Sequence, residues 1–286
     1  MIKFIAEVSS NHHRSIDRSF AFIDAAVEAG CQAVKFQLFR VEKLFAPEIL
    51  KNSEEHRKRK DWELPLDFIP KLAERCKDND IEFACTPFYL DAVSELDPFV
   101  DFYKIASYEL LWDDLLAKCA QTGKPVIIST GMANILEIQH GVEVLKNNGC
   151  PNPIILHCNS AYPTPFSDAN LMAIDTIRNA TNCKVGWSDH TVEPGVIHRA
   201  INKWGATVIE FHLDLDGAGE EFESGHCWLP DQISNVIADI NKAIKSDGNG
   251  LKEPSISELP DREWRADPID GLRPHKSIRN NWQKDK

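Results

Sequence analysis

The sequence predicts a (β/α)8 barrel, an α/β TIM barrel, with a short C-terminal extension. Three observations favour this fold: eight short β-rich runs, amphipathic helical patterns between them, and glycines where several of those patterns end. The runs are apolar on both faces, which is typical of a parallel sheet covered by helices. Eight such units in about 245 residues match one closed barrel.

Each element can be placed along the chain. Gly30, Gly123, Gly149 and Gly205 each follow a helical pattern, where a left-handed C-cap favours glycine. A doubly wound open sheet is the alternative, but EVSSNHHRS after the first strand lacks the glycine-rich phosphate loop usual there. The expected strands are 2–7, 33–37, 82–86, 102–105, 126–130, 154–158, 184–188 and 207–211, and the clearest helices are 17–29, 135–147, 195–204 and 231–245.

Composition limits the function classes. The chain has 286 residues, of which 43% are hydrophobic and 27% charged, enough for a catalytic barrel over 1–250 and a tail over 251–286 without a core of its own. The net charge of −12 argues against a nucleic-acid partner. No apolar run approaches the ~18 residues of a membrane span, and the N-terminus does not resemble a signal peptide. We therefore expect a cytoplasmic protein with no membrane partner.

The eight cysteines include no CxxC pair, and several lie inside apolar runs. This pattern indicates reduced, buried thiols in a cytosolic protein rather than disulfides.

Polar side chains stand at or just beyond the carboxyl end of every expected strand. In a barrel these ends meet at one rim, where barrel enzymes carry out their chemistry. One polar strand end is unremarkable, but eight of eight indicate an active site. The residues are Glu7, Asn11 and His12; Lys35 and Gln37; Thr86; Lys104, Ser107 and Glu109; Ser129 and Thr130; His157, Ser160 and Tyr162; Ser188, Asp189 and His190; and Glu210 and His212.

Two of these side chains point to an anionic substrate. Lys35 and Lys104 each lie within an apolar strand. Burying an ammonium group without an anionic partner costs several kcal/mol. Each lysine is therefore expected to meet a phosphate or a carboxylate.

Eight segments resemble one known family. They are IAEVSSNH, VKFQ, TPF, YKIASYE, ISTGMA, LHCNSAYPTP, GWSDHT and VIEFH, in the order and spacing of the sialic acid synthases, which include synthases of N-acetylneuraminic, legionaminic and pseudaminic acids. The resemblance covers residues 2 to about 245. It implies condensation of phosphoenolpyruvate with the open-chain aldehyde of an amino sugar, with release of phosphate. It also implies a divalent metal, Mn²⁺ or Mg²⁺.

The resemblance assigns the metal to two histidines, His212 at the end of the last strand and His226 in the loop after it. This loop departs from the family, which usually has a PGPDH-like segment where this chain has EFESGH. Its acidic residues either join the coordination or are solvated, and we expect solvation. These residues are Asp214, Asp216, Glu220, Glu221 and Glu223.

The remaining roles also follow from the resemblance. Glu7 matches a catalytic glutamate near the metal, and Glu109 matches one near the sugar hydroxyls. The first motif has Ser9 and Arg14 where glycines are common, which puts substrate contacts near that strand in doubt. The residues expected to contact phosphoenolpyruvate or sugar are Lys35, Thr86, Lys104, Ser107, Ser129, Ser160 and Tyr162, joined on the same rim by Asn11, Gln37, Ser188, Asp189 and Glu210.

Some alternatives stay open at this point. Asp189 and His190 either contact substrate or orient the ligands, whereas His157 is expected to be a hydrogen-bonded core histidine. The protein could also be a phosphoenolpyruvate-dependent synthase of a shorter 3-deoxy-ulosonic acid, or a non-catalytic barrel. The partners expected are small-molecule substrates and a second copy in a homo-oligomer, a dimer.

The tail has its own open question. Family members typically continue into a small antifreeze-like domain whose arginine contacts the amino sugar, and residues 251–286 do not resemble it. Either Trp264 packs the tail on the outside of the barrel, or Arg265 or Arg273 replaces the missing arginine. In both cases we expect the acceptor to differ from the usual N-acetylated hexosamine.

Overall fold

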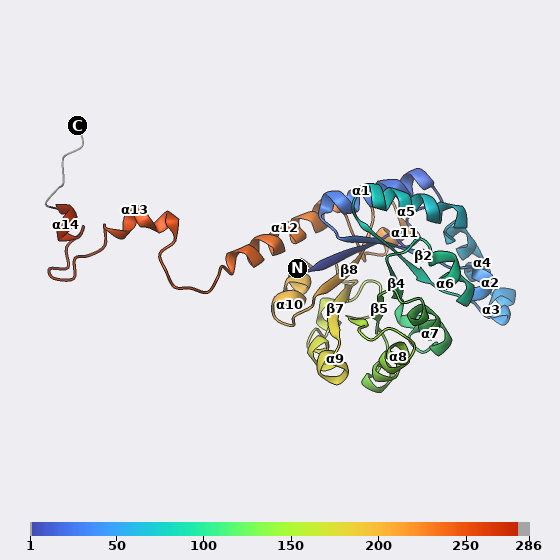
Figure 1. Cartoon of the computed structure of the whole chain (residues 1–286). Coiled ribbons are helices and arrows are strands. Elements are labelled where there is room, and N and C mark those ends of the chain that lie inside the picture. The colour runs from blue at the N-terminus through green and yellow to red at the C-terminus, as the bar shows by residue number, and fades with distance from the viewer. Residues whose placement is uncertain (1, 280–286) are drawn as a thin grey trace. The chain divides into compact units, whose positions relative to one another are not determined.

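The computed structural model describes residues 2–279, and the chain divides into two compact units, 1–240 and 241–286. The division lies within helix α12 (Pro230–Ser246), earlier than the expected boundary at residue 250, which stays a prediction. Figure 1 shows the strands of the first unit enclosed by a ring of helices. None of the helices within residues 2–279 combines the length and apolar character that crossing a membrane requires.

The first unit is a closed parallel barrel, which confirms the predicted fold class. Neighbouring strands pair in chain order, and the first pairs with the eighth, so the sheet closes. A short ninth strand, β9 (Cys227–Trp228), which the sequence did not predict, pairs in parallel with the eighth. The barrel strands are β1 (Lys3–Glu7), β2 (Ala33–Leu38), β3 (Glu82–Pro87), β4 (Phe102–Ile105), β5 (Val126–Ser129), β6 (Ile154–Cys158), β7 (Lys184–Asp189) and β8 (Val208–Leu213).

Local sequence signals set the helix ends. Ser15 caps the first helix by accepting from the amide of Arg18, and Gly30 ends it at φ 88°. Asn134 and Glu137 form a capping box, in which each side chain accepts from the other residue's amide. The outer helices are α1 (Ile16–Ala29), α5 (Ile69–Asp78), α6 (Leu90–Leu96), α7 (Asp113–Gln121), α8 (Ile135–Asn147), α9 (Ala173–Thr181), α10 (Pro194–Asn202) and α12.

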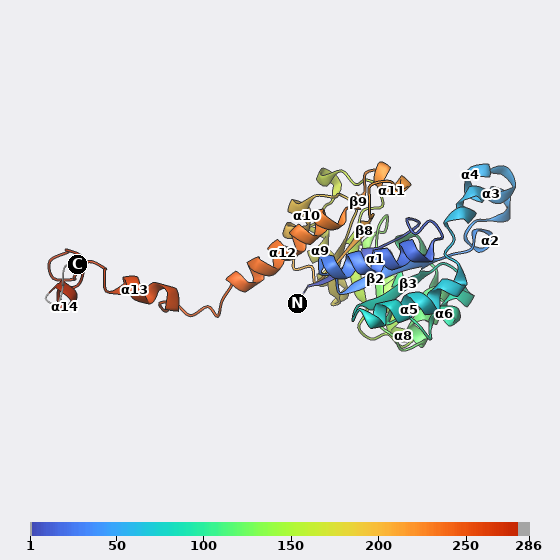
Figure 2. The same ribbon diagram turned by 90° about the horizontal axis from the view of Figure 1, so that it is seen from above.

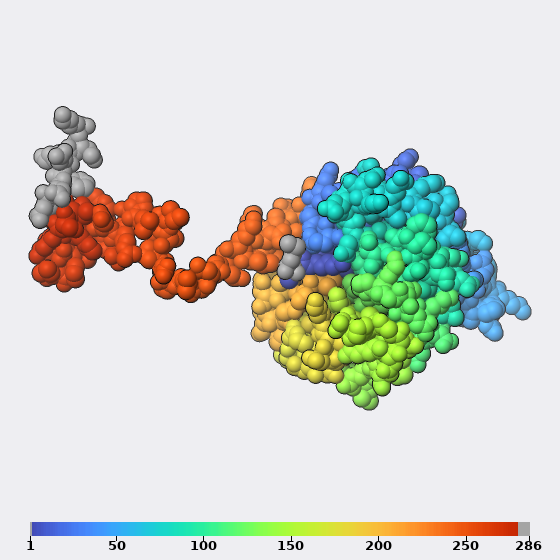
Figure 3. All heavy atoms as spheres, viewed as in Figure 1, coloured from blue at the N-terminus to red at the C-terminus, as the bar shows by residue number. Residues whose placement is uncertain are grey.

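Short helices occupy the long connections. Between β2 and β3 the chain forms α2 (Val41–Leu44), α3 (Pro47–Asn52), α4 (Glu54–Lys58), η1 (Arg59–Trp62) and η2 (Leu66–Phe68). Figures 2 and 3 show that α2 to α4 protrude as a lobe from one side of the barrel unit. The other short helices of this unit are η3 (Ser107–Glu109), η4 (Phe166–Asp168) and α11 (Glu220–Glu223).

The barrel interior is layered. Because side chains alternate between the two faces of a strand, residues two apart on one strand share a face. A small apolar cluster, separate from the core between sheet and helices, fills the interior: Ile5, Ala33, Ala84, Phe102, Ile127, Leu156 and Val208. The residues two positions further along these strands, on the same inward face, are Glu7, Lys35, Thr86, Lys104, Ser129, Cys158 and Glu210, with Ser188 in the equivalent place on β7.

The described part of the second unit, residues 241–279, contains η5 (Ile256–Glu258), α13 (Leu259–Arg262) and α14 (Lys276–Arg279). Asp267 accepts from the amides of Ile269 and Lys276, and Arg279 pairs with Asp270. The two readings of this tail stay predictions.

Candidate active site

The inward polar layer contains two buried ion pairs. Lys35 on β2 pairs with Glu7 on β1 and donates to Thr86 Oγ1 at 3.1 Å. Lys104 on β4 lies 3.3 Å from Glu210 Oε1 across the barrel. All four charged side chains are almost completely buried. The expectation that each lysine meets an anion is thus satisfied within the protein by a carboxylate.

These charges set one another's ionisation. Burial alone would raise the pKa of Glu210, but the ammonium groups of Lys104 and Lys35 lower it to about 2. Burial alone would lower the pKa of Lys35, but Glu210 and Glu7 raise it above its usual value. Burial lowers the pKa of Lys104, although Glu210 partly opposes this effect. The layer therefore holds the carboxylate of Glu210 and the firmly charged ammonium group of Lys35.

Several buried polar atoms in this region lack a partner. Among the described residues, no hydrogen bond reaches Oε2 of Glu109, Oγ of Ser129, Oγ of Ser160 or Oε2 of Glu210. Leaving such a group unsatisfied costs about 1–3 kcal/mol, so a native protein rarely keeps several without reason. A polar ligand seated on the layer would satisfy them.

Gly131, which follows β5, lets two of the predicted hydroxyls approach the backbone closely. A Cβ at this position would lie 2.1 Å from Ser160 Oγ and 3.0 Å from Ser107 Oγ. Its amide donates to Ser107 Oγ at 2.9 Å. The close approach therefore requires glycine here, and it leaves a small cradle lined by a backbone amide and two hydroxyls, which suits an anion.

A cavity of about 780 Å³ lies at the same end of the barrel. Five of the predicted site residues line it: Gln37, Glu109, Tyr162, His212 and His226. A further part of its wall comes from the connection between β2 and β3: Phe39, Leu44, Phe45, His56, Arg59 and Trp62. Its volume suits a small-molecule ligand of the size of a sugar.

Glu109, which lines this cavity, has a pKa above the ordinary value of a glutamate. Its side chain is buried, and burial raises its pKa to about 7, while Lys104 opposes the rise only in part. A carboxyl group with a pKa near 7 can exchange a proton with a substrate at neutral pH.

Four side chains form a candidate metal-binding cluster, the His212–Glu221–His226–Cys227 cluster. One ligand atom from each lies within 4.8 Å of all the others. Nδ1 of His212 lies 2.8 Å from Oε2 of Glu221, and Nε2 of His226 lies 3.5 Å from the same oxygen. Nδ1 of His226 is buried and lacks a partner among the described residues. The structure thus brings together the two histidines that the resemblance assigned to a metal.

The expectation that the acidic loop is solvated is wrong for two of its members. Glu221 lies between the histidines, and its Oε1 accepts from the hydroxyls of Ser9 and Ser10. Asp214 is fully buried and pairs with Arg18 at 3.1 Å. Acidic side chains of a loop can become buried when cationic groups or hydrogen-bond donors of the barrel pair with them. Ser9, where the family commonly has glycine, is one of those donors.

Two predicted substrate contacts have structural roles instead. Asp189 lies on the outward face of β7, and its carboxylate accepts from the indoles of Trp187 and Trp228 and from Thr191. Asn11 is buried, and its amide donates to the carbonyl of Leu213 at 3.0 Å. Both side chains therefore fix the loops around the site.

Most of the remaining predicted residues lie on the inward face or at its edge, whereas His157 lies on the outward face of β6, between Leu156 and Cys158. Gln37 donates to Glu7 at 2.9 Å, and Ser188 donates to Glu210 at 3.3 Å. Tyr162 packs on His190, with ring centroids 4.2 Å apart, and burial lowers the pKa of His190 to about 3, so its ring is neutral. His157 bonds the carbonyl of Ala169 at 2.9 Å, which confirms its expected structural role.

The sequence interpretation missed four contributors: Gly131, Glu221, Cys227 and the β2–β3 connection. The adjacency of Cys227 to His226 was a usable signal, because neighbouring ligand-type residues often share a site. All eight cysteines are buried and unpaired, as expected, so burial alone did not single out this one.

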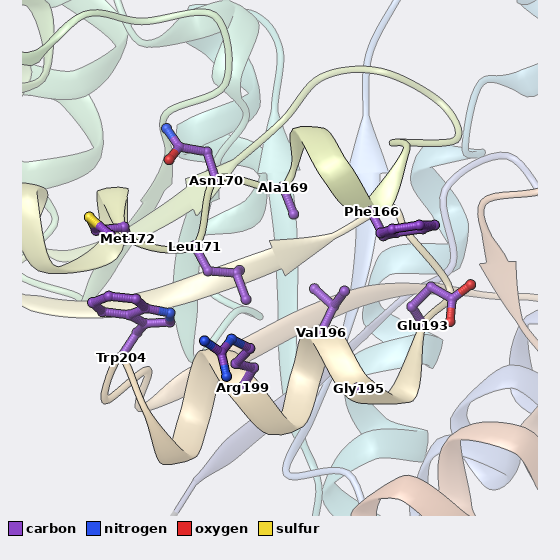
Figure 4. A pocket seen from close by; sticks show the side chains of 10 residues that line it. All are labelled: Phe166, Ala169, Asn170, Leu171, Met172, Glu193, Gly195, Val196, Arg199 and Trp204. Carbon is purple, nitrogen blue, oxygen red and sulfur yellow. The ribbon is translucent and has the colours of Figure 1, made fainter.

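A second cavity, of about 570 Å³, lies on the outside of the barrel (Figure 4). Phe166, Leu171 and Met172 line it on one side, and Val196, Arg199 and Trp204 line it on the other. No group of ligand-type residues that could hold a metal lies there among the described residues. The polar layer and the cluster instead make the barrel mouth the candidate active site.

Comparison with known proteins agrees with this geometry. Residues 22–252 match the NeuB family. The chain belongs to the NeuB family. The N,N'-diacetyllegionaminic acid synthase of Campylobacter jejuni is 32% identical over 271 residues, covering 89% of this chain and 80% of that protein. A pseudaminic acid synthase of the same species is 31% identical, covering 90% and 78%. The predicted resemblance is confirmed, and this NeuB protein is a synthase.

A solved structure extends the match to three dimensions. The N-acetylneuraminic acid synthetase of Leptospira borgpetersenii, solved in complex with citrate, superposes with a TM-score of 0.80 at 31% identity. The match covers 92% of this chain and 91% of that one. The barrel is therefore the NeuB catalytic fold.

Proposed function

We propose that this protein joins phosphoenolpyruvate to the open-chain aldehyde of an amino sugar, with a divalent metal, to give a sialic-acid-like 3-deoxy-ulosonic acid and phosphate. The observation that carries the proposal is that two features lie at the same end of the barrel: the layer of buried charges and unpartnered polar atoms, and the His212–Glu221–His226–Cys227 cluster. His212, Glu221 and His226 also line the sugar-sized cavity there. Family membership supports the reaction class.

The first substrate would occupy the polar layer. Lys35 and Lys104 would stabilise its negative charge, and the Gly131 cradle with Ser107 and Ser160 would donate to its oxygens. Before substrate binds, the ion pairs with Glu7 and Glu210 would hold the two lysine side chains in place. An anion bound near the lysines would then compete with these two side chains for them.

The residues present fit a divalent metal. The cluster offers two imidazoles and a carboxylate facing the cavity, and Nε2 of His226 lies 3.5 Å from Oε2 of Glu221. Bound there, the ion would supply Lewis-acid polarisation of the aldehyde oxygen. The identity of this metal, Mn²⁺ or Mg²⁺ by the resemblance, stays a prediction.

The reaction would form one carbon–carbon bond and break one carbon–oxygen bond. C3 of phosphoenolpyruvate attacks the aldehyde carbon, the aldehyde oxygen gains a proton, and water adds at C2. The bond between C2 and the phosphate oxygen then breaks and releases phosphate. By the resemblance, Glu7 would take a proton from the water, and Glu109, which lines the cavity, would lie near the sugar hydroxyls. Much of the rate would come from holding the two substrates together.

The test is a panel of aldoses with phosphoenolpyruvate and Mn²⁺ or Mg²⁺, followed by release of inorganic phosphate and by mass of the product. The panel should contain acetamido and diacetamido hexoses, unsubstituted hexoses and pentoses, and their phosphates. Turnover with an acetamido sugar supports the proposal. Turnover with only a short unsubstituted aldose would favour the shorter 3-deoxy-ulosonic acid. A cytoplasmic location and a homo-oligomeric state stay predictions.

A further inference from the structure

Cys227 lies beside the two histidines because of the pairing between β8 and β9. In this parallel pair, Cys227 is the register partner of His212, so both side chains lie on the same face. Its Sγ lies 3.9 Å from Oε2 of Glu221 and 3.7 Å from Nδ2 of Asn11. The thiol is buried. It therefore has an amide donor on one side and three ligand-type groups on the other.

The spacing of these atoms suits a tetrahedral ion. Around an ion with typical zinc distances, of about 2.0–2.1 Å to nitrogen and oxygen and 2.3 Å to sulfur, neighbouring ligand atoms lie roughly 3.3–3.6 Å apart. Oε2 of Glu221 lies 2.8 Å from His212, 3.5 Å from His226 and 3.9 Å from Cys227. Small side-chain movements would bring all four atoms onto one ion.

We propose that Cys227 and Glu221 are direct ligands, which complete with His212 and His226 a four-residue site selective for Zn²⁺, Fe²⁺ or Co²⁺ over Mn²⁺ and Mg²⁺. A thiolate favours these softer ions, whereas Mn²⁺ and Mg²⁺ prefer oxygen ligands. This inference deepens the proposed function, since it names the metal class of the same site.

Outer contacts support both added ligands. Asn11 donates to Cys227, and Ser9 and Ser10 donate to Glu221 from its far side. Hydrogen bonds of this kind orient metal ligands and favour their deprotonated forms. The structural role found for Asn11, which replaces its expected substrate contact, is thereby explained.

The four proposed ligands differ in whether they line the cavity where substrate would bind. His212, Glu221 and His226 line the cavity, whereas Cys227 does not. The thiolate would thus anchor the ion from the barrel wall, and the cavity side would face the substrate oxygen. Glu221 can move toward Ser9 and Ser10 if a coordination position has to open.

The test uses the full chain, stripped with chelator and then loaded with Co²⁺. A Cys227–Co²⁺ bond gives a thiolate-to-metal charge-transfer band in the near ultraviolet, and tetrahedral geometry gives intense visible bands. We expect both in the wild type, loss of the ultraviolet band in Cys227→Ser, and an unchanged spectrum in Cys183→Ser, a buried cysteine at the opposite end of β7. Stoichiometric Co²⁺ binding without that band in the wild type overturns the inference.

Metal competition gives a second readout. Cys227→Ser should weaken Zn²⁺ binding by at least about tenfold while Mn²⁺ binding changes less. If the variant does not fold, X-ray absorption of the Zn²⁺-loaded wild type decides, because one sulfur neighbour at about 2.3 Å is required. A site with nitrogen and oxygen neighbours alone contradicts the inference yet leaves the proposed function standing. The aldose panel is repeated with protein loaded with Zn²⁺, Fe²⁺ or Co²⁺. Its failure with all of these ions and with Mn²⁺ and Mg²⁺, while a sulfur neighbour is present, contradicts the proposed function alone.

Discussion

Nζ of Lys104 lies 3.3 Å from Oε1 of Glu210, and both side chains are almost completely buried. Each charge therefore depends on the other in the absence of substrate. A buried ion pair contributes little net stability, but removing one partner leaves an uncompensated charge and is strongly destabilising. We therefore expect Lys104 to have two separable roles, in stability and in substrate binding.

Lys104→Ala should lower the free energy of unfolding by about 3–5 kcal/mol and abolish turnover. Adding Glu210→Gln should restore most of the stability but none of the activity, because the ammonium group is still missing. Thermal melts and phosphate-release assays on both variants measure this. Lys71→Ala, which breaks an exposed pair with Asp67, is the control and should change stability by less than about 1 kcal/mol. A double variant with wild-type kcat/KM for phosphoenolpyruvate would remove Lys104 from the site.

Glu109 should make stability depend on pH. Because burial raises its pKa to about 7, the folded protein binds this proton more tightly than the unfolded chain, whose glutamates titrate near 4.3. Stability is therefore complete below about pH 4 and falls as pH rises through 7. Glu109→Gln should be as stable as the wild type at low pH and more stable at pH 8, by roughly 4 kcal/mol, since one pKa unit is about 1.4 kcal/mol.

Melting temperatures of the wild type and Glu109→Gln, compared at pH 4.5 and pH 8, test this expectation. Glu143→Gln, an exposed position on α8, is the matched control and should show no such difference. An equal offset at both pH values would mean that Glu109 titrates normally.

Metal removal should abolish activity. Exhaustive chelation is expected to lower the rate by roughly 100-fold or more, because Lewis-acid stabilisation is worth several kcal/mol. Adding back a divalent ion should restore the wild type but not His212→Ala. His140→Ala, an exposed histidine paired with Asp113 on the outer surface, should be restored normally. Full activity of a protein shown by elemental analysis to be metal-free would rule out a catalytic ion.

The sequence was sufficient to predict the barrel and many of the polar side chains that its inward face brings together. Strands apolar on both faces and helices between them have few other arrangements, so strand ends were placed within about two residues. The inward residues Lys35 and Lys104 stood out because charge is rare inside apolar strands. For Asp189 the same reasoning failed. Adjacent residues at a strand end point to opposite faces of the sheet, and the sequence did not show whether Ser188 or Asp189 points inward.

Loops were harder to interpret. Five carboxylates lie between residues 214 and 223, and only folding decides that Glu221 reaches the histidines while Asp214 pairs with Arg18. The contacts of Glu221 with Ser9 and of Asp214 with Arg18 join residues about 200 positions apart, and no local sequence pattern predicts them. Cys227 was hidden for another reason, since a buried ligand and a buried core thiol look alike in sequence.

Gly131 provides a steric test of where phosphoenolpyruvate binds. In Gly131→Ala the new Cβ would lie 2.1 Å from Ser160 Oγ, so one of the two must shift and the cradle narrows. Overpacking of this kind costs about 1–3 kcal/mol, so KM for phosphoenolpyruvate should rise roughly tenfold or more, with a smaller effect on the aldose. Ser160→Ala in the same chain should relieve part of the steric effect. Gly195→Ala on α10, where a Cβ meets nothing within 4 Å, is the control and should leave both KM values unchanged. Steady-state kinetics with each substrate varied in turn decide the matter. If Gly131→Ala folds and keeps the wild-type KM for phosphoenolpyruvate, the phosphate and carboxylate bind elsewhere in the layer.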